Sequence, residues 1–230
     1  MNSPADTHLT ERRPWRMRDA LVAFVTGVVT STVAYLLVNG DPVADAFGVV
    51  LPAQIVGMVG ALAWIGRRRQ PWRHALRWSA RWSDLVGIPI GFGIQVVLAL
   101  VLATLIETFG LESPGQHVLY TAADAATAGQ WVLVVLGAVV LAPVAEEILF
   151  RGVMVRALEN RGRRVAVYTS AFLFSAAHGL DPGAWILLPS LFVVGVVLGY
   201  ELLRTGRLGR AIAIHAGFNL LPVIGLIAGI

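Results

Sequence analysis

Two adjacent carboxylates, Glu146 and Glu147, follow directly on an uncharged apolar stretch that begins at Trp131. Arg151 comes four residues after Glu147. A charged side chain near the centre of a bilayer costs about 2.5–3.5 kcal/mol even on insertion scales, so these charges need internal partners or a water-filled cavity. A carboxylate in such a cavity can take a proton from water. We therefore expect the chemistry of this protein at this position.

The two glutamates differ in their expected partners. Glu147 and Arg151 have a spacing that places side chains on one face of a helix. Glu146 points about 100° away from Glu147, because a helix has 3.6 residues per turn. We interpret Glu147 and Arg151 as a structural ion pair and Glu146 as the free carboxylate. In a second interpretation, Arg151 extends to the membrane interface instead.

Two further apolar stretches carry polar residues at helical spacing. Phe174 and His178 are four residues apart, and so are His215 and Asn219. With Glu146, three helices then present carboxylate, imidazole and amide groups. A carboxylate can deprotonate water, an imidazole can orient it, and imidazole or amide donors can stabilise an oxyanion. The pattern is typical of a site that activates water.

The three motifs, Glu-Glu-x-x-x-Arg, Phe-x-x-x-His and His-x-x-x-Asn, together resemble the CPBP family of intramembrane proteases. That family includes the type II CAAX prenyl endopeptidases, the lysostaphin-resistance-protein-A-like domains and the bacterial proteins once called Abi, some of which are associated with bacteriocin self-immunity. The resemblance covers residues 130–222, and this core is less than half of the chain.

The resemblance implies an intramembrane endopeptidase in which Glu146 is the general base and His178 helps to activate the water. It also implies that His215 and Asn219 form the oxyanion site. The residues that it implies as supports of the architecture are Glu147, Arg151 and Phe174.

The sequence leaves the cofactor open. The family is variously described as metalloprotease and as glutamate-dependent protease, and no His-Glu-x-x-His pair is present. Glu146, His178 and His215 could nevertheless supply the three protein ligands of an open catalytic zinc site. Zinc and a metal-free, glutamate-activated water therefore both stand as interpretations.

Composition indicates a membrane protein. Of 230 residues, 57% are hydrophobic and 14% are charged, whereas soluble domains average about 45–50% and about 25%. The absence of cysteine excludes disulfides and thiol nucleophiles. All basic residues are arginines, in four groups at 12–18, 67–81, 151–164 and 204–210. Such separated groups are typical of cytoplasmic loops and not of the continuous basic face of a nucleic-acid-binding protein, so we expect no nucleic-acid partner.

These groups predict an all-α, polytopic transmembrane helix bundle with a cytoplasmic N-terminus, in a bacterial plasma membrane. A cytoplasmic polar tail, 1–18, precedes a single transmembrane domain, 19–230. The seven predicted spans are 19–38, 44–66, 84–108, 131–158, 165–179, 185–203 and 211–229.

The basic loop 67–81 has arginines at every fourth position beside tryptophans. This spacing favours an interfacial helix at 69–82 that contacts anionic lipid. A basic loop that only sets topology is equally compatible with the pattern. We interpret His74 in this loop and His117 in the loop after the third span as solvated residues.

Five other residues have simpler interpretations. Pro143 is expected to kink the fourth span and free carbonyls toward the cavity. Ser175 lacks a Gly-x-Ser-x-Gly frame and is interpreted as a packing residue, not a nucleophile. Asp84, Glu201 and Arg204 lie near span ends and are interpreted as interface residues.

The expected depths of the site residues in the membrane do not agree with one another. Glu146 and His178 each lie about 21 Å from the cytoplasmic ends of their spans, but His215 lies only about 7 Å from its own end. The three residues can meet only if the seventh span is tilted or shifted, or if the fourth helix projects beyond the membrane.

Three functions fit these observations. The first is an endopeptidase that acts on a membrane protein or a lipidated peptide. The second is a non-enzymatic scaffold or bacteriocin-immunity-type protein of the same fold. The third, an ion-coupled transporter, ranks last because no matched pair of Gly/Pro-broken helices is present. The substrate itself is not indicated by the sequence.

Overall fold

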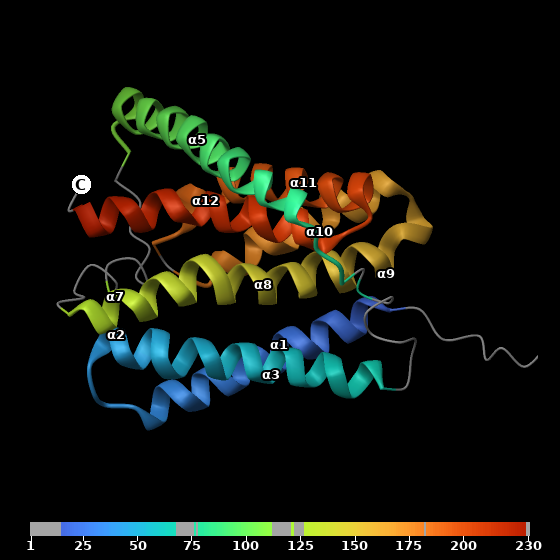
Figure 1. Cartoon of the computed structure of the whole chain (residues 1–230), viewed down its shortest axis with the longest axis horizontal. Coiled ribbons are helices and arrows are strands. Elements are labelled where there is room, and N and C mark those ends of the chain that lie inside the picture. Colours follow the sequence, from blue (N-terminus) through green and yellow to red (C-terminus); the bar gives the residue numbers. More distant parts are fainter. Residues whose placement is uncertain are drawn as a thin grey trace, which may run out of the picture.

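The computed structural model of the chain describes residues 15–67, 76, 78–111, 121, 127–181 and 183–228. Regular structure within these residues is entirely helical. Six helical segments are long and apolar enough to cross a membrane, so the chain is a multi-pass integral membrane protein. The predicted all-α polytopic bundle is confirmed (Figure 1).

The six long segments are built from consecutive helical elements. The first is α1 (Met17–Leu37), and the second joins α2 (Pro42–Asp45), η1 (Ala46–Val50) and α3 (Leu51–Gly66). The third joins η2 (Trp82–Val86) and α5 (Gly87–Phe109). The fourth joins α7 (Ala128–Val135), η3 (Leu136–Leu141), α8 (Ala142–Glu147), η4 (Ile148–Val155), α9 (Arg156–Leu158) and η5 (Glu159–Arg161). The remaining two are η6 (Trp185–Leu187) with α11 (Leu188–Thr205), and α12 (Leu208–Ala228).

The predicted number of spans is corrected at 165–179. This stretch is helical as expected, as α10 (Arg163–His178), but it contains 16 residues. At 1.5 Å per residue α10 is about 24 Å long, less than the ~30 Å hydrocarbon core. The described residues therefore form seven helical segments, of which six are long enough to span. His178 lies at the C-terminal end of α10.

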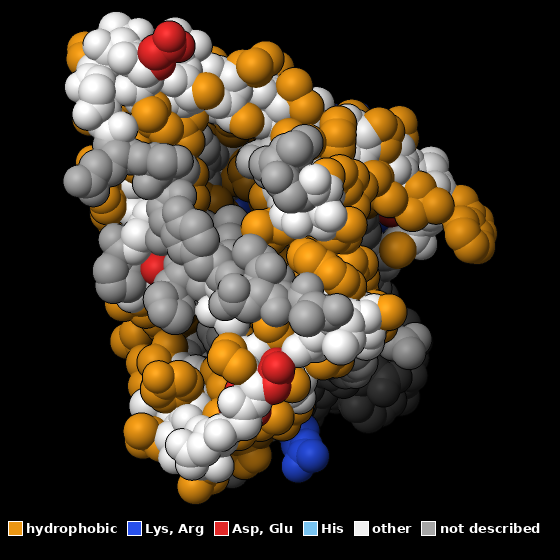
Figure 2. Space-filling view, turned by 90° about the vertical axis from the view of Figure 1, so that its left-hand side faces the viewer, with side chains coloured by type: hydrophobic (Ala, Val, Ile, Leu, Met, Phe, Trp, Pro, Cys, Tyr) orange, Lys and Arg blue, Asp and Glu red, His pale blue; other side chains and the backbone are white. Residues whose placement is uncertain are grey.

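The helix ends that border the arginine groups gather at one end of the bundle, the right-hand end of Figure 1. The opposite end faces the viewer in Figure 2, and its described surface is largely apolar with a few acidic side chains. This arrangement agrees with the up-and-down trace that the arginine groups predict.

Several predictions concern loop residues that lie outside the described part of the chain. Residues 1–14 of the tail, 68–75 and 77 of the basic loop, His74 and His117 lie outside the described residues. The predicted interfacial helix at 69–82 is not seen in its described part, because residues 78–81 are not helical and η2 begins at Trp82. The anionic-lipid contact of this loop stays a prediction.

Helix α5 packs against α12 through glycines that bring the two backbones together. A Cβ atom on Gly91 would lie 1.8 Å from the carbonyl oxygen of Ile214, and one on Gly217 would lie 2.0 Å from that of Ile88. Small residues at helix crossings permit such close approach in membranes. Beyond this crossing, α5 diverges from α12 (Figure 1).

Asp84 anchors the start of the third segment, and its interpretation as an interface residue stays a prediction. Its side chain is buried, and its Oδ1 accepts a hydrogen bond from Arg207 Nη2 at 2.6 Å. Arg210 Nε lies 3.6 Å from the same oxygen. The hydrogen bond to Asp84 raises the pKa of Arg207 above its usual value. The pair ties η2 to the start of α12.

We predict that Gly91→Ala destabilises the protein and that Gly93→Ala does not. The added methyl group at position 91 meets backbone that cannot rotate away, and overpacking of this kind costs about 1–3 kcal/mol. Position 93 has no atom within 4 Å of an added Cβ. The thermal unfolding midpoint of the detergent-solubilised protein measures the difference. Equal midpoints for the two variants would contradict the crossing described here.

Candidate active site

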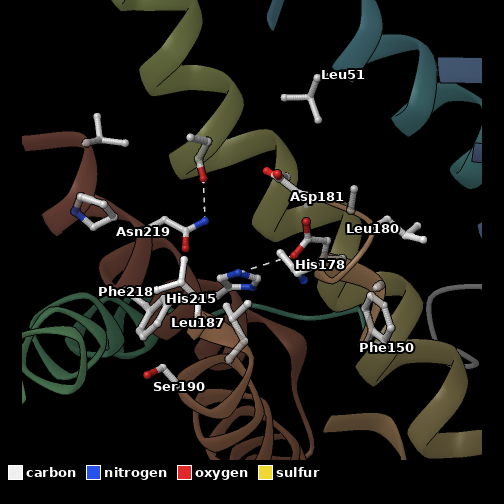
Figure 3. A pocket seen from close by; sticks show the side chains of 18 of the residues that line it. Leu51, Phe150, His178, Leu180, Asp181, Leu187, Ser190, His215, Phe218 and Asn219 are labelled. Atoms are coloured by element: carbon white, nitrogen blue, oxygen red, sulfur yellow. Dashed lines mark hydrogen bonds and ion pairs between the residues drawn. The ribbon is translucent and has the colours of Figure 1, made fainter. Parts of the chain in front are cut away.

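The four predicted catalytic residues lie around one cavity of about 940 Å³ (Figure 3). Glu146 comes from α8, His178 from the end of α10, and His215 and Asn219 from α12. The rest of the lining is mostly apolar and comes from every long helical segment. The structure thus brings together residues that are up to 73 positions apart in the chain.

Pro143 explains how Asn219 is held. In the π-helix η3, backbone N–H groups bond five residues back, and the N–H of Ala142 reaches the carbonyl of Gly137. The next donor in this register would be Pro143, which has no N–H. The carbonyl of Ala138 is therefore free to accept a hydrogen bond from Asn219 Nδ2, at 2.9 Å. The freed carbonyl that Pro143 predicts is present, and it positions a site residue.

The predicted ion pair between Glu147 and Arg151 is confirmed. Arg151 Nη1 donates to Glu147 Oε1 at 2.9 Å, and both side chains are completely buried. Arg151 Nη2 also donates to the carbonyl of Gly195 at 3.1 Å. A buried guanidinium with these partners excludes the alternative in which Arg151 extends to the interface.

A second partner of Glu147 is not predicted by the sequence. His215 Nδ1 lies 2.9 Å from Glu147 Oε1, the same oxygen that binds Arg151. Because the carboxylate paired with Arg151 accepts hydrogen bonds, His215 Nδ1 carries the proton. Glu147 is therefore both an ion-pair partner and the residue that orients the His215 ring.

His215 also faces the second glutamate. Its Nε2 lies 3.6 Å from Glu146 Oε2, too long for a strong hydrogen bond but close enough for charge interaction. With the proton of neutral imidazole on Nδ1, Nε2 has only a lone pair. Attraction to Glu146 then requires one further proton, on the ring or on the carboxyl group.

His178 is oriented by the backbone of its own helix. Its Nδ1 lies 2.9 Å from the carbonyl oxygen of Phe174, which can only accept, so Nδ1–H is the donor. In the neutral ring, Nε2 is then free to accept a proton or a water hydrogen. This is the form that a residue assisting water activation needs.

Phe174 lies at the centre of the polar group. Its ring is completely buried and meets the rings of His178 and His215 edge-on, with centroid distances of 4.8 Å and 5.5 Å. The guanidinium carbon of Arg151 lies 4.6 Å from the Phe174 centroid, within cation–π range. Phe174 therefore separates the two imidazoles at a fixed distance and covers the buried cation.

The depth problem is answered by the length of the fourth segment. It runs from Ala128 to Arg161 as 34 helical residues, about 51 Å, and so exceeds the hydrocarbon core by a wide margin. Its arginine end therefore reaches further than that of α12. Glu146 and His215 meet although their distances from those ends differ.

The possible zinc set is not assembled. Within the described residues, no three His, Cys, Asp or Glu side chains lie close enough together to hold a metal ion. Glu146, His178 and His215 line one cavity without forming such a group. The interpretation of these residues as three zinc ligands stays a prediction, and no step below uses a metal.

Two other residues of the α10 region have clear positions. Ser175 Oγ donates to the carbonyl of Leu188 at 2.6 Å, which agrees with a packing role. Asp181, three residues after His178, lines the cavity and was not among the predicted site residues. The signal available in the sequence was a charged residue just beyond a helix too short to cross the membrane.

The fold and site define a multi-pass membrane protein whose helices enclose a cavity with a glutamate–histidine pair. Residues 128–221 match the family model described as type II CAAX prenyl endopeptidase Rce1-like, so this part of the chain is a domain of that family. The matched residues include all the predicted site residues. No curated protein matches the chain, and neither does any solved structure.

We predict that Arg151→Met destabilises the protein by about 3–5 kcal/mol, because it leaves the Glu147 carboxylate buried without its cation. The double variant Glu147→Gln/Arg151→Met should recover most of this loss, since glutamine is neutral and still accepts from His215. Thermal midpoints in detergent measure both effects. A double variant no more stable than Arg151→Met would show that the buried charge is not the cause.

Proposed function

We propose that this protein is an intramembrane endopeptidase that hydrolyses a peptide bond of a membrane-associated or lipidated protein. The observation that carries the proposal is the Glu146–His215 contact at the wall of the cavity, inside a domain of a peptidase family. The apolar lining suits a substrate segment that comes from the bilayer or carries a lipid.

The proposed reaction uses water as the nucleophile. Glu146 takes a proton from water while the oxygen attacks the scissile carbonyl carbon, and His178 Nε2 orients that water. His215 and Asn219 lie beside each other on α12 (Figure 3), where they would donate hydrogen bonds to the developing oxyanion. Glu146 then returns the proton to the leaving nitrogen as the C–N bond breaks. The products are a carboxylic acid and an amine.

The hydrogen bond of His215 to Glu147 decides which of its ring nitrogens can serve the oxyanion. Its Nε2 can donate to an oxyanion only when it carries a proton while Nδ1–H remains bonded to Glu147. Nε2 must therefore carry a proton when the oxyanion forms. In this proposal Glu147 acts through His215 and is a positioning residue.

The arginine groups indicate how the protein is oriented in the membrane. We propose that the arginine-rich end faces the cytoplasm, which places the N-terminus inside the cell, and that the membrane is a bacterial plasma membrane. The cavity would then receive its substrate from the bilayer or from the cytoplasmic side.

We predict that Glu146→Gln lowers the hydrolysis rate by about 10²–10⁴-fold, the usual contribution of a positioned general base. Wild-type and variant protein in proteoliposomes would be tested on internally quenched peptides, one set ending in a prenylated CAAX sequence and one with an apolar membrane anchor. Glu107→Gln, at an exposed position outside the cavity, is the matched control and should retain full activity. Undiminished cleavage by Glu146→Gln would overturn the mechanism. A wild-type protein that cleaves no member of either set would favour the scaffold function.

A further inference from the structure

Asp181 places a second carboxylate in the wall of the cavity. It lies in the turn after α10 and lines the cavity together with Glu146 and His178. Figure 3 shows Asp181 and His178 on one side of this space and His215 and Asn219 on the other. A charged group at this position faces whatever occupies the cavity beside the proposed catalytic residues.

The surroundings of Asp181 make its charge notable. Its side chain is half-buried, and the other residues that line the cavity are mostly apolar. Ionisable residues in the cavities of membrane proteins usually have a charged partner and serve a function. Asp181 lines the cavity, and the next step is to identify its charged partner.

Two buried carboxylates of this protein have cations as partners. Glu147 binds Arg151, and Asp84 binds Arg207. Asp181 has no ion pair with any described residue, and its recorded side-chain bond is the one its Oδ1 accepts from the N–H of Gly183, at 3.2 Å. The charge of Asp181 is therefore uncompensated within the described part of the chain.

The cavity lining supplies no compensation either. None of its described residues is Lys or Arg. Arg151 lies behind the wall, completely buried, and is occupied by Glu147 and the Gly195 carbonyl. A ligand in the cavity therefore meets the carboxylates Glu146 and Asp181 and no lysine or arginine among these described residues.

We propose that Asp181 is a specificity-determining residue that binds a positively charged group of the substrate, a Lys or Arg side chain close to the scissile bond. This proposal rests on the proposed function. A carboxylate and a substrate cation form a charge-assisted hydrogen bond, which is strong where water is excluded. A free carboxylate in the same place would be repelled, so the negative wall also acts against substrates that put a C-terminal carboxylate there.

A purely structural role does not need the charge. The bond from the Gly183 N–H requires only an oxygen acceptor in the side chain at position 181. Asparagine offers the same oxygen at the same place. Asp181→Asn therefore keeps the turn and removes the charge.

Binding is tested on the Glu146→Gln protein in nanodiscs, where turnover does not interfere. The probes are fluorescent peptides with an apolar membrane anchor, identical except for Lys, Gln or Glu placed in turn at each position beside the anchor. At one or two positions, the Lys peptide should bind about tenfold or more tightly than the Glu peptide, as expected for close charge pairs. Adding Asp181→Asn should remove most of this preference, and Asp181→Lys should reverse it.

The matched control is Glu107→Gln on the same background, which also replaces a carboxylate by an amide and should leave the preference unchanged. Elution profiles and thermal midpoints establish that each variant is folded. The proposal is overturned if Lys and Glu peptides bind alike at every position, or if Asp181→Asn keeps the preference.

Cleavage assays separate this proposal from the proposed function. If wild-type protein cleaves the peptides without a charge preference, the proposed function stands and the proposed role of Asp181 is overturned. If the protein shows the Asp181-dependent binding preference but cleaves no peptide, the charged subsite stands and the endopeptidase function is overturned.

Discussion

One carboxylate oxygen, Glu147 Oε1, connects three helices at the centre of this molecule through hydrogen bonds. It accepts hydrogen bonds from Arg151 and from His215, both at 2.9 Å, in a place without solvent. Through Arg151 it reaches the backbone of α11, and through His215 it reaches α12. Removing either partner would leave a buried group without compensation, which is far more costly than losing a surface ion pair. Three helices are thereby fixed at the depth where the cavity has its polar side.

Backbone irregularity completes this arrangement. The π-helices η3 and η4 flank α8, and Pro143 removes the donor that would otherwise bond Ala138. In an apolar medium every freed carbonyl needs a new partner, and Asn219 supplies it. His178 likewise uses the Phe174 carbonyl. The site residues are therefore oriented by main-chain groups as well as by charges, which limits how far they can move.

Unequal helix lengths create the cavity and set its depth. The fourth segment has 34 residues, whereas α10 has 16, and the turn after α10 brings Asp181 to the wall of the cavity. Helix α5 adds a further wall, because it is fastened to α12 at its start by Gly91 and Asp84 and diverges beyond that point. The result is a mostly apolar space with its polar groups gathered around Glu146.

The sequence by itself determined the helices, their approximate ends and the pairing of Glu147 with Arg151. These depend on local quantities, namely the length of apolar runs and the i, i+4 spacing within one helix. Its three motifs also identified the family. Only the tertiary structure decided that His215 is bound to Glu147 as well as facing Glu146, and that Asp181 shares the cavity. Those facts depend on the crossing and relative depth of separate helices, and no spacing along the chain encodes them.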